Sequence, residues 1–226
     1  PFPEDEDRTD KQWREYLLTA LAERGIDRES IGGVLLETFQ GWGARMLPVG
    51  YVHAIRWLAT DCGFPLAFDE VQTGFGRTGR LFGHEHYDVD ADMICLGKGL
   101  SSTLPIAALV GRREFVDTLP PGEVTTTHAG HPLSCAAALA NLDVLIEQEL
   151  VARAARLGVI CDAKLGELAA DFAGCVTRVS GAGLLWAIHF QENIKGISGH
   201  EFARQVVNQS VLRGVMLFHV NKHTVK

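Results

Sequence analysis

A single lysine, Lys98, stands between two glycines, after the apolar run 93–96 and before a cluster of hydroxyl side chains. Glycine has no side chain, so the backbone beside Lys98 can turn sharply and another molecule can come close to the amine. A lysine amine attacks carbonyl carbons, and the usual product is a Schiff base. The residues around position 98 therefore indicate a nucleophilic site more than a solvated surface charge.

The richest use of this chemistry is with pyridoxal 5'-phosphate, whose ring withdraws electrons well only while its pyridine nitrogen is protonated. An adjacent carboxylate favours that protonated form. Asp69 closes an apolar run 29 residues before Lys98, and residues 125–127 offer hydroxyls and amides for a phosphate before a predicted helix. Taken singly, these are a turn cap, a surface charge and an ordinary loop. Together and in this order, they predict a site for pyridoxal phosphate.

Alternating helices and strands must position these residues. The expected helices span 10–25 and 48–63, and the expected strands span 31–39, 65–70, 92–97 and 106–111. Strand, helix and strand with short connections favour a parallel sheet with helices on both faces. Ligands of such sheets bind at the carboxyl ends of the strands, where Asp69 and Lys98 both fall.

The last third of the chain has a different pattern of expected helices and strands. Two long helices are expected over 132–149 and 150–172, then a hairpin over 175–190, a helix over 199–214 and a strand over 215–220. This pattern indicates the start of a smaller α+β domain, without a third or fourth strand to complete its sheet. We assign residues 1–172 to part of a large cofactor-binding domain and residues 173–226 to a partial C-terminal domain.

Composition narrows the class of protein. The 226 residues are 46% apolar and 22% charged, with a formal net charge of -7, which gives no reason to expect nucleic acid or an anionic membrane as a partner. The five cysteines show no metal-binding spacing and are typical of reduced thiols. No stretch approaches the ~18 apolar residues that span a bilayer. We expect a soluble, cytoplasmic protein with no metal, and the start at Pro1 suggests that an upstream part is missing.

Three segments, 37–44, 68–111 and 125–145, resemble the class III aminotransferases of ornithine, 4-aminobutyrate and ω-amine transamination. The motifs that carry the resemblance are DEVQTGFGRTG, at 69–79, and GKG, at 97–99. The resemblance implies an α/β fold of fold type I, with a mostly parallel sheet flanked by helices in the large domain. It also implies transfer of an amino group from an amino acid or amine to a keto acid or aldehyde. The chain corresponds to the central and C-terminal part of such an enzyme.

The resemblance assigns roles to five residues. Lys98 is similar to the lysine that holds the cofactor and then moves a proton between the substrate Cα and the cofactor C4'. Asp69 is similar to the partner of the pyridinium nitrogen. Gln72 would bond the phenolic oxygen of the ring, and Val71 would pack on one ring face. Thr127 resembles a threonine that reaches the phosphate of the other subunit, which implies a homodimer with shared active sites.

Some positions depart from the family pattern or leave alternatives open. Trp42 stands where the ornithine and 4-aminobutyrate enzymes have a glutamate, so those specificities are less favoured, and the indole either contacts a bulky apolar amine or fills space. Arg77 and Arg80 lie in a loop that either binds an anion or is simply solvated. Glu70 is expected to be a structural pairing residue. Alternatives to transamination are racemisation, epimerisation or decarboxylation on the same scaffold, and a non-catalytic fragment that lacks the upstream half of the cofactor site.

Overall fold

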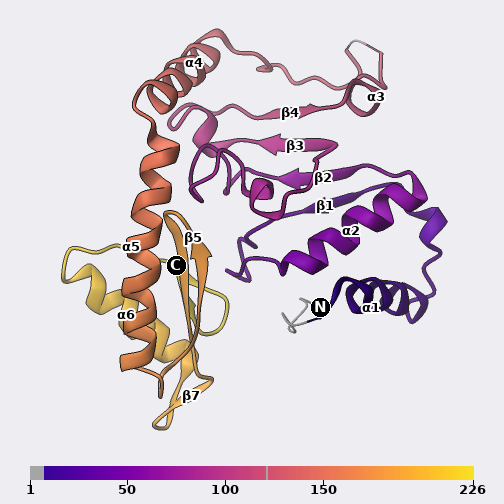
Figure 1. Ribbon diagram of the computed structural model, residues 1–226. Helices are drawn as coiled ribbons and strands as arrows, with labels where there is room; N and C mark the ends of the chain where they lie inside the picture. Colours follow the sequence, from indigo (N-terminus) through magenta and orange to yellow (C-terminus); the bar gives the residue numbers. More distant parts are fainter. Residues whose placement is uncertain (1–7, 121) are drawn as a thin grey trace.

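The computed structural model describes residues 8–120 and 122–226, which contain two four-stranded β-sheets connected by long helices, and a separate two-stranded β-sheet (Figure 1). The first sheet has the strand order β1-β2-β3-β4. Its strands are β1 (Val34–Leu36), β2 (Leu66–Asp69), β3 (Met93–Leu96) and β4 (Ala108–Gly111). β1, β2 and β3 are parallel, whereas β4 pairs antiparallel with β3. The reversal follows from the short connection over 97–107, since a parallel crossover needs a dozen or more residues.

Helix α2 (Val49–Cys62) covers one face of the first sheet, and α1 (Asp10–Ala22) packs against α2. α1 begins at a capping box in which Thr9 and Gln12 bond each other's backbone amides. Apolar residues at helical spacing then meet the sheet in the main core. Its buried members include Trp13, Leu17, Val52, Ile55, Leu58, Leu66 and Phe68. Burial of each such side chain stabilises the fold by about 1.5–3 kcal/mol, which fixes α2 on β2.

The other face of the first sheet is largely open in the part of the chain that the structure describes. Leu35 and Leu109 lie on this face by strand register, and they are 60% and 55% exposed. Ala138 of α4 (Pro132–Glu147) packs on Leu96, on the same face that α2 covers. The sequence pattern predicts helices on both faces, and the described helices cover one.

The second half of the chain builds the other sheet around α5 (Leu150–Asp171), which runs from the edge of the first sheet along the second (Figure 1). The strand order is β5-β6-β10-β9, with all described pairs antiparallel. The remaining elements are β5 (Val176–Ala182), β6 (Leu185–Phe190), β7 (Asn193–Ile194), β8 (Ile197–Ser198), α6 (Gly199–Val211), β9 (His219–Val220), β10 (Thr224–Val225), α3 (Arg113–Val116) and the 3-10 helices η1 (Arg28–Ser30), η2 (Gly83–Tyr87) and η3 (Lys98–Leu100).

The expectation that the second sheet lacks a third and fourth strand is wrong. β9 and β10 supply them, although each is two residues long. Asn221 has a φ of 46° in the turn between them, and its side chain accepts a hydrogen bond from the His223 amide at 3.1 Å. Strands this short carry no alternating pattern, so periodicity cannot reveal them.

The two sheets are in contact through buried side chains. Phe39 and Ala44, from the loop after β1, pack against Leu185 and Ala187 of β6. His189 of β6 is also buried, and its Nε2 lies 3.0 Å from the carbonyl oxygen of Ala44. The proposed division at residues 172 and 173 falls between α5 and β5, which themselves pack together, and it stays a prediction.

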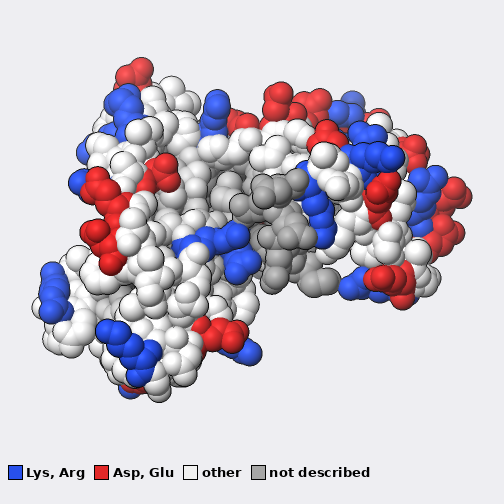
Figure 2. Space-filling model, turned by 60° about the horizontal axis from the view of Figure 1, so that its bottom comes forward, with Lys and Arg blue, Asp and Glu red and all other residues white. Residues whose placement is uncertain are grey.

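Charged groups of both signs are spread over the surface in Figure 2, where acidic and basic side chains alternate on the face shown. The helices described by the structure include none that is both long and apolar enough to cross a bilayer.

Candidate active site

Asp69 and Lys98 lie at the same edge of the first sheet. Asp69 is the last residue of β2 and is in register with Cys95 of the parallel neighbour β3. Lys98 follows Cys95 by three residues, just beyond the end of β3. The structure therefore brings both residues to the carboxyl ends of adjacent strands, as the sequence predicts.

The backbone around Lys98 is tightly packed and strained. Lys98 has a φ of 38°, in the left-handed region that costs a non-glycine residue about 1–2 kcal/mol. A Cβ on Gly97 would lie 3.4 Å from a Val71 methyl, and one on Gly99 would lie 3.3 Å from the Phe75 ring. The glycines on either side thus allow the turn to pack closely. The Lys98 side chain itself is exposed and makes no ion pair with a described carboxylate.

Asn141 of α4 holds this turn in place. Its Nδ2 donates to the carbonyl oxygens of Gly99, at 2.8 Å, and Leu100, at 3.2 Å, and its Oδ1 accepts from the Ser102 hydroxyl at 2.7 Å. Asn141 is not among the site residues predicted from the sequence. The available signal was one amide side chain within an otherwise apolar helical run, and such a side chain needs hydrogen-bond partners when it packs inward.

Asp69 is held by the start of the following turn. Its Oδ1 accepts a hydrogen bond from the Val71 amide at 3.0 Å, which fixes the carboxylate at the end of β2. Burial, together with the negative charge of Asp69, raises the pKa of the neighbouring Cys95 thiol. The carboxylate thus already affects ionisation at this sheet edge, as expected for a group that favours a nearby cation.

Glu70 has the structural role that the sequence predicts. Its carboxylate is completely buried and accepts bonds from the Thr73 hydroxyl, the Gly83 and His84 amides and the His84 ring. Burial alone would raise the pKa of Glu70, but these hydrogen bonds outweigh it and lower that pKa. Glu70 therefore ties the turn after β2 to η2, and this contact supports the position of Gln72.

Gln72 has an unused donor at the site. Its Nε2 is buried and has no hydrogen-bond partner in the part of the chain that the structure describes. Its Oε1 accepts from the Lys226 Nζ at 3.3 Å, and that ammonium also donates to the Gly41 carbonyl oxygen at 3.2 Å. Burial and the charge of Lys98 lower the pKa of Lys226. An unpaired amide donor beside two ammonium groups is suited to an anionic ligand oxygen.

Lys226 is a further site residue that the sequence pattern does not indicate. It reaches the site because β10 pairs with β6 in the second sheet and lies near the loop after β1. No local pattern around position 226 indicates this approach, which depends on strands far apart in the chain.

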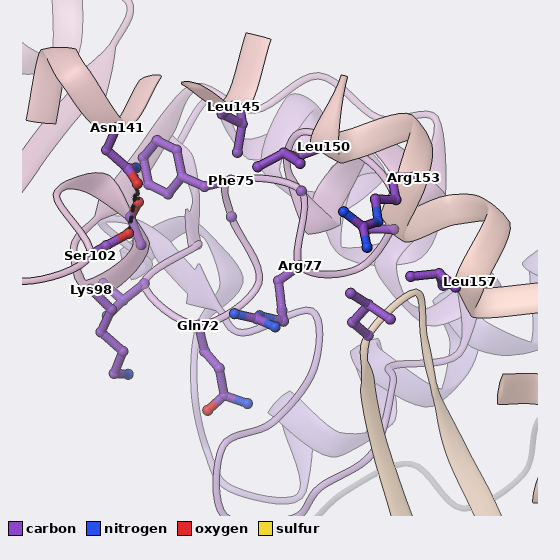
Figure 3. A pocket seen from close by; sticks show the side chains of 16 residues that line it. Gln72, Phe75, Arg77, Lys98, Ser102, Asn141, Leu145, Leu150, Arg153 and Leu157 are labelled. Atoms are coloured by element: carbon purple, nitrogen blue, oxygen red, sulfur yellow. Dashed lines mark hydrogen bonds between the residues drawn. The ribbon is translucent and has the colours of Figure 1, made fainter. Parts of the chain in front are cut away.

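Val71, Gln72 and Lys98 line one cavity of about 520 Å³ (Figure 3). In Figure 3 the Lys98 and Gln72 side chains extend to the same side from neighbouring backbone segments. Trp42 is 76% exposed, and its carbonyl oxygen accepts from the Asn221 side chain at 3.4 Å. Thr127 lies in an exposed turn before α4 and does not line this cavity. The structure thus groups four of the six predicted site residues, counting Asp69, and leaves Trp42 and Thr127 apart.

The arrangement defines a lysine-centred site at the strand ends of an α/β sheet. The family model for class III aminotransferases matches residues 2–226, and the chain belongs to this family.

Solved structures show the same likeness. An S-selective transaminase from Arthrobacter sp. is 32% identical, with a TM-score of 0.82, over 94% of this chain and 49% of that one. A Toxoplasma gondii ornithine aminotransferase, described with partial occupancy of PLP at its active site, is 30% identical, with a TM-score of 0.81, over 92% of this chain and 47% of that one. A transaminase from the marine bacterium Virgibacillus is 29% identical, with a TM-score of 0.82, over 97% of this chain and 52% of that one. The present chain therefore spans about half the length of these proteins.

Proposed function

We propose that the natural protein that carries this chain is a pyridoxal-phosphate-dependent aminotransferase. It moves an amino group from an amino acid or amine to a keto acid or aldehyde in two half-reactions. The observation that carries the proposal is the pairing of Asp69 and Lys98 at adjacent strand ends, in a chain of the class III family. When bound, the cofactor supplies an aldehyde for the amino group and a ring that withdraws electrons from the adjacent carbon.

The described residues fit this cofactor. The free Nε2 of Gln72 is a donor for the phenolic oxygen of the ring. The Asp69 carboxylate, oriented by the Val71 amide, favours a protonated ring nitrogen. The Val71 side chain lines the cavity and can pack on a ring face. These assignments agree with the roles that the resemblance implies.

Lys98 is proposed as the catalytic residue. Its exposed amine, on a turn fixed by Asn141, attaches the cofactor between turnovers and moves a proton from the substrate Cα to the cofactor C4'. A rigid backbone with a mobile side chain suits this role, because the same nitrogen must serve two carbons in turn.

We further propose that the protein is a cytoplasmic homodimer. The five cysteines are free, which is typical of a reducing compartment. The position of Thr127 outside the cavity of its own chain fits a contact with the phosphate in a second subunit. Trp42, exposed beside Gly41, is then free to meet the substrate or the partner subunit.

The test uses the natural full-length protein loaded with pyridoxal phosphate and mixed with an amine donor. Lys98→Ala should abolish turnover and borohydride fixation of the cofactor, because the amine that does both is removed. Lys195→Ala is the matched control, since Lys195 is also an exposed lysine with a positive φ of 51°, and it should keep full activity. Normal turnover by Lys98→Ala would refute the assignment.

The same assay separates the other reactions on this scaffold. Keto-acid product and conversion of the cofactor to its amine form are expected for transamination. Loss of optical rotation without keto acid would indicate a racemase, and release of carbon dioxide would indicate a decarboxylase. Absence of all three from the loaded full-length protein would leave a non-catalytic role.

A further inference from the structure

Two histidine rings lie against each other where α6 meets β9. The ring centroids of His200, in the first turn of α6, and His219, in β9, are 4.7 Å apart, and the ring planes are tilted by 53°. The Nε2 of His219 is buried and has no hydrogen-bond partner in the described ranges. Because buried polar atoms in folded proteins are almost always satisfied, this nitrogen indicates a place for a bound water or ion.

The pairing of distant strands brings the two histidines together. His219 is directly opposite Val225 in the ladder of β9 and β10, so their side chains lie on the same face of the second sheet. Val225 packs with Ala203 of α6 in the core beneath that helix. His219 therefore lies on the α6 side of the sheet. The sequence does not predict this contact, since the 19 residues that separate the two histidines match no metal-binding spacing.

Neither ring is engaged by another polar group. No residue that the structure describes forms a hydrogen bond or an ion pair with the His200 or His219 side chain. The adjacent carboxylate on α6, that of Glu201, is already bonded to Arg204 at 2.8 Å and to Gln205 at 2.9 Å. Within the described ranges, no three His, Cys, Asp or Glu side chains are placed to hold a metal ion. The pair therefore offers two imidazole ligands, and water would complete the coordination.

The separation of the rings fits two ligands of one metal ion. A metal–nitrogen bond of about 2.0–2.1 Å places the ion about 3.2 Å from the centre of each imidazole ring. The ring centres are then about 4.5 Å apart if the two bonds meet at a right angle and about 5.2 Å apart at the tetrahedral angle. The observed distance of 4.7 Å lies between these values. His200 is exposed, so its ring can turn to admit an ion from solvent.

We propose that His200 and His219 bind a divalent transition-metal ion, represented by Zn²⁺, which joins α6 to β9. Imidazole nitrogens suit Zn²⁺, Cu²⁺ and Ni²⁺, whereas Mg²⁺ and Ca²⁺ prefer oxygen ligands. Neither histidine lines the cavity beside Lys98, so the inference does not depend on the proposed function.

The ion would also restrain the strand that reaches the active site. Phe218, next to His219, exchanges two backbone hydrogen bonds with Lys226, at 2.8 and 2.9 Å. The Lys226 ammonium in turn donates to the Gln72 side chain at 3.3 Å. A link between His219 and α6 therefore restrains the open end of the β9–β10 hairpin, where Lys226 lies.

The test measures Zn²⁺ binding by titration calorimetry to the natural full-length protein, loaded with cofactor and carrying no histidine tag. His200→Gln and His219→Gln should each weaken binding at least about tenfold, a loss that follows even when a group that only supports a ligand is removed. Because both rings hold one ion, the double variant should bind within about twofold of the weaker single variant. His131→Gln changes an exposed histidine outside the pair and should stay within about twofold of wild type.

Hydrogen exchange of the same protein tests the link to the hairpin. With Zn²⁺ at 100 times its Kd, exchange of the Phe218 and Lys226 amides should slow by up to about 100-fold, because opening of the hairpin must release the ion. His200→Gln should show no such slowing, and its exposed position keeps the result independent of any folding defect in His219→Gln.

Three outcomes would overturn the shared site. They are no Zn²⁺ binding by wild type, equal affinity in wild type and both single variants, and losses that simply add in the double variant. Binding of Mg²⁺ as tight as that of Zn²⁺ would contradict imidazole ligation. Unchanged exchange of the Phe218 and Lys226 amides in the Zn²⁺-saturated wild type would overturn the restraint on the hairpin.

Discussion

At the scale of single residues, the sheet edge combines a fixed acid with an amine that is free to move. Asp69 is held by the Val71 amide, whereas the Lys98 side chain has no carboxylate partner among the described residues. A carboxylate fixed in advance stabilises positive charge without the cost of reorganising during the reaction. The difference between the two side chains fits their different proposed tasks, which are to hold a charge and to transfer a proton.

Asp69→Asn is the sharpest residue-level test of this electrostatic role. Asparagine can still accept from the Val71 amide, so the turn is retained while the charge is lost. Turnover of the loaded full-length protein should fall at least about 100-fold, the size typical of losing one preorganised electrostatic group.

A second readout of the same variant does not depend on catalysis. Because Asp69 contributes to raising the pKa of Cys95, its neutralisation should lower that pKa and speed alkylation of Cys95 near pH 8, followed by peptide mass spectrometry. Asp88→Asn, at an exposed position with a φ of 52° that asparagine tolerates, is the control and should alter neither property. Unchanged turnover and unchanged Cys95 reactivity in Asp69→Asn would contradict the electrostatic role.

At the scale of elements, the sequence could predict whatever depends on local periodicity and on strand ends. Both early helices, the strands of the first sheet and the meeting of Asp69 with Lys98 follow from apolar spacing and from parallel pairing. The antiparallel direction of β4 also follows from the sequence, through the short connection over 97–107, although the pattern of alternating strands and helices suggested a parallel strand. The two-residue strands β9 and β10 do not follow from it, because they depend on long-range pairing. Lys226 was missed for the same reason, since its partners are remote in the chain, whereas the apolar run around Asn141 offered a local signal.

The turn between β5 and β6 gives an element-level prediction. Gly183→Ala should lower the free energy of unfolding by about 2–4 kcal/mol, because it combines a left-handed φ with a backbone clash at Thr78. Gly196→Ala is the control, since Gly196 has a φ of 87° but no atom within 4 Å of an added Cβ, and it should cost about 1 kcal/mol. Urea unfolding of both variants measures the difference. Equal losses would show that the close contact does not matter.

At the scale of the whole molecule, a buried neutral histidine joins the two sheets. The His189 ring bonds the Ala44 carbonyl oxygen on one side and, at 2.9 Å, the Thr224 hydroxyl on the other. Burial lowers the pKa of His189 from its ordinary value of 6.5 to about 4, and the charges of Arg45, Arg178 and His223 act in the same direction. The contact between the sheets therefore requires the uncharged ring.

This linkage predicts a loss of stability in mild acid. Between about pH 6.5 and 4 the unfolded chain binds a proton at His189 that the folded chain does not, so stability falls as the pH falls. The loss from this group should approach about 3 kcal/mol at pH 4, from 1.36 kcal/mol per pKa unit. Urea unfolding between pH 7 and 4 should show that the free energy of unfolding falls less steeply with pH in His189→Gln than in wild type. His128→Gln changes an exposed histidine and should show the same pH dependence of stability as wild type. If the stability of His189→Gln fell as steeply with pH as that of wild type, the linkage would be contradicted.

The close contact of Gly79 with α5 and of Gly183 with Thr78 also bears on how this scaffold can be redesigned. Position 77 is exposed and its side chain is not needed for packing, so a saturation library there should give mostly well-folded variants. Positions 79 and 183 have no such tolerance, because any larger residue meets backbone atoms. A redesign of this loop should therefore vary position 77 while Gly79 and Gly183 are left unchanged.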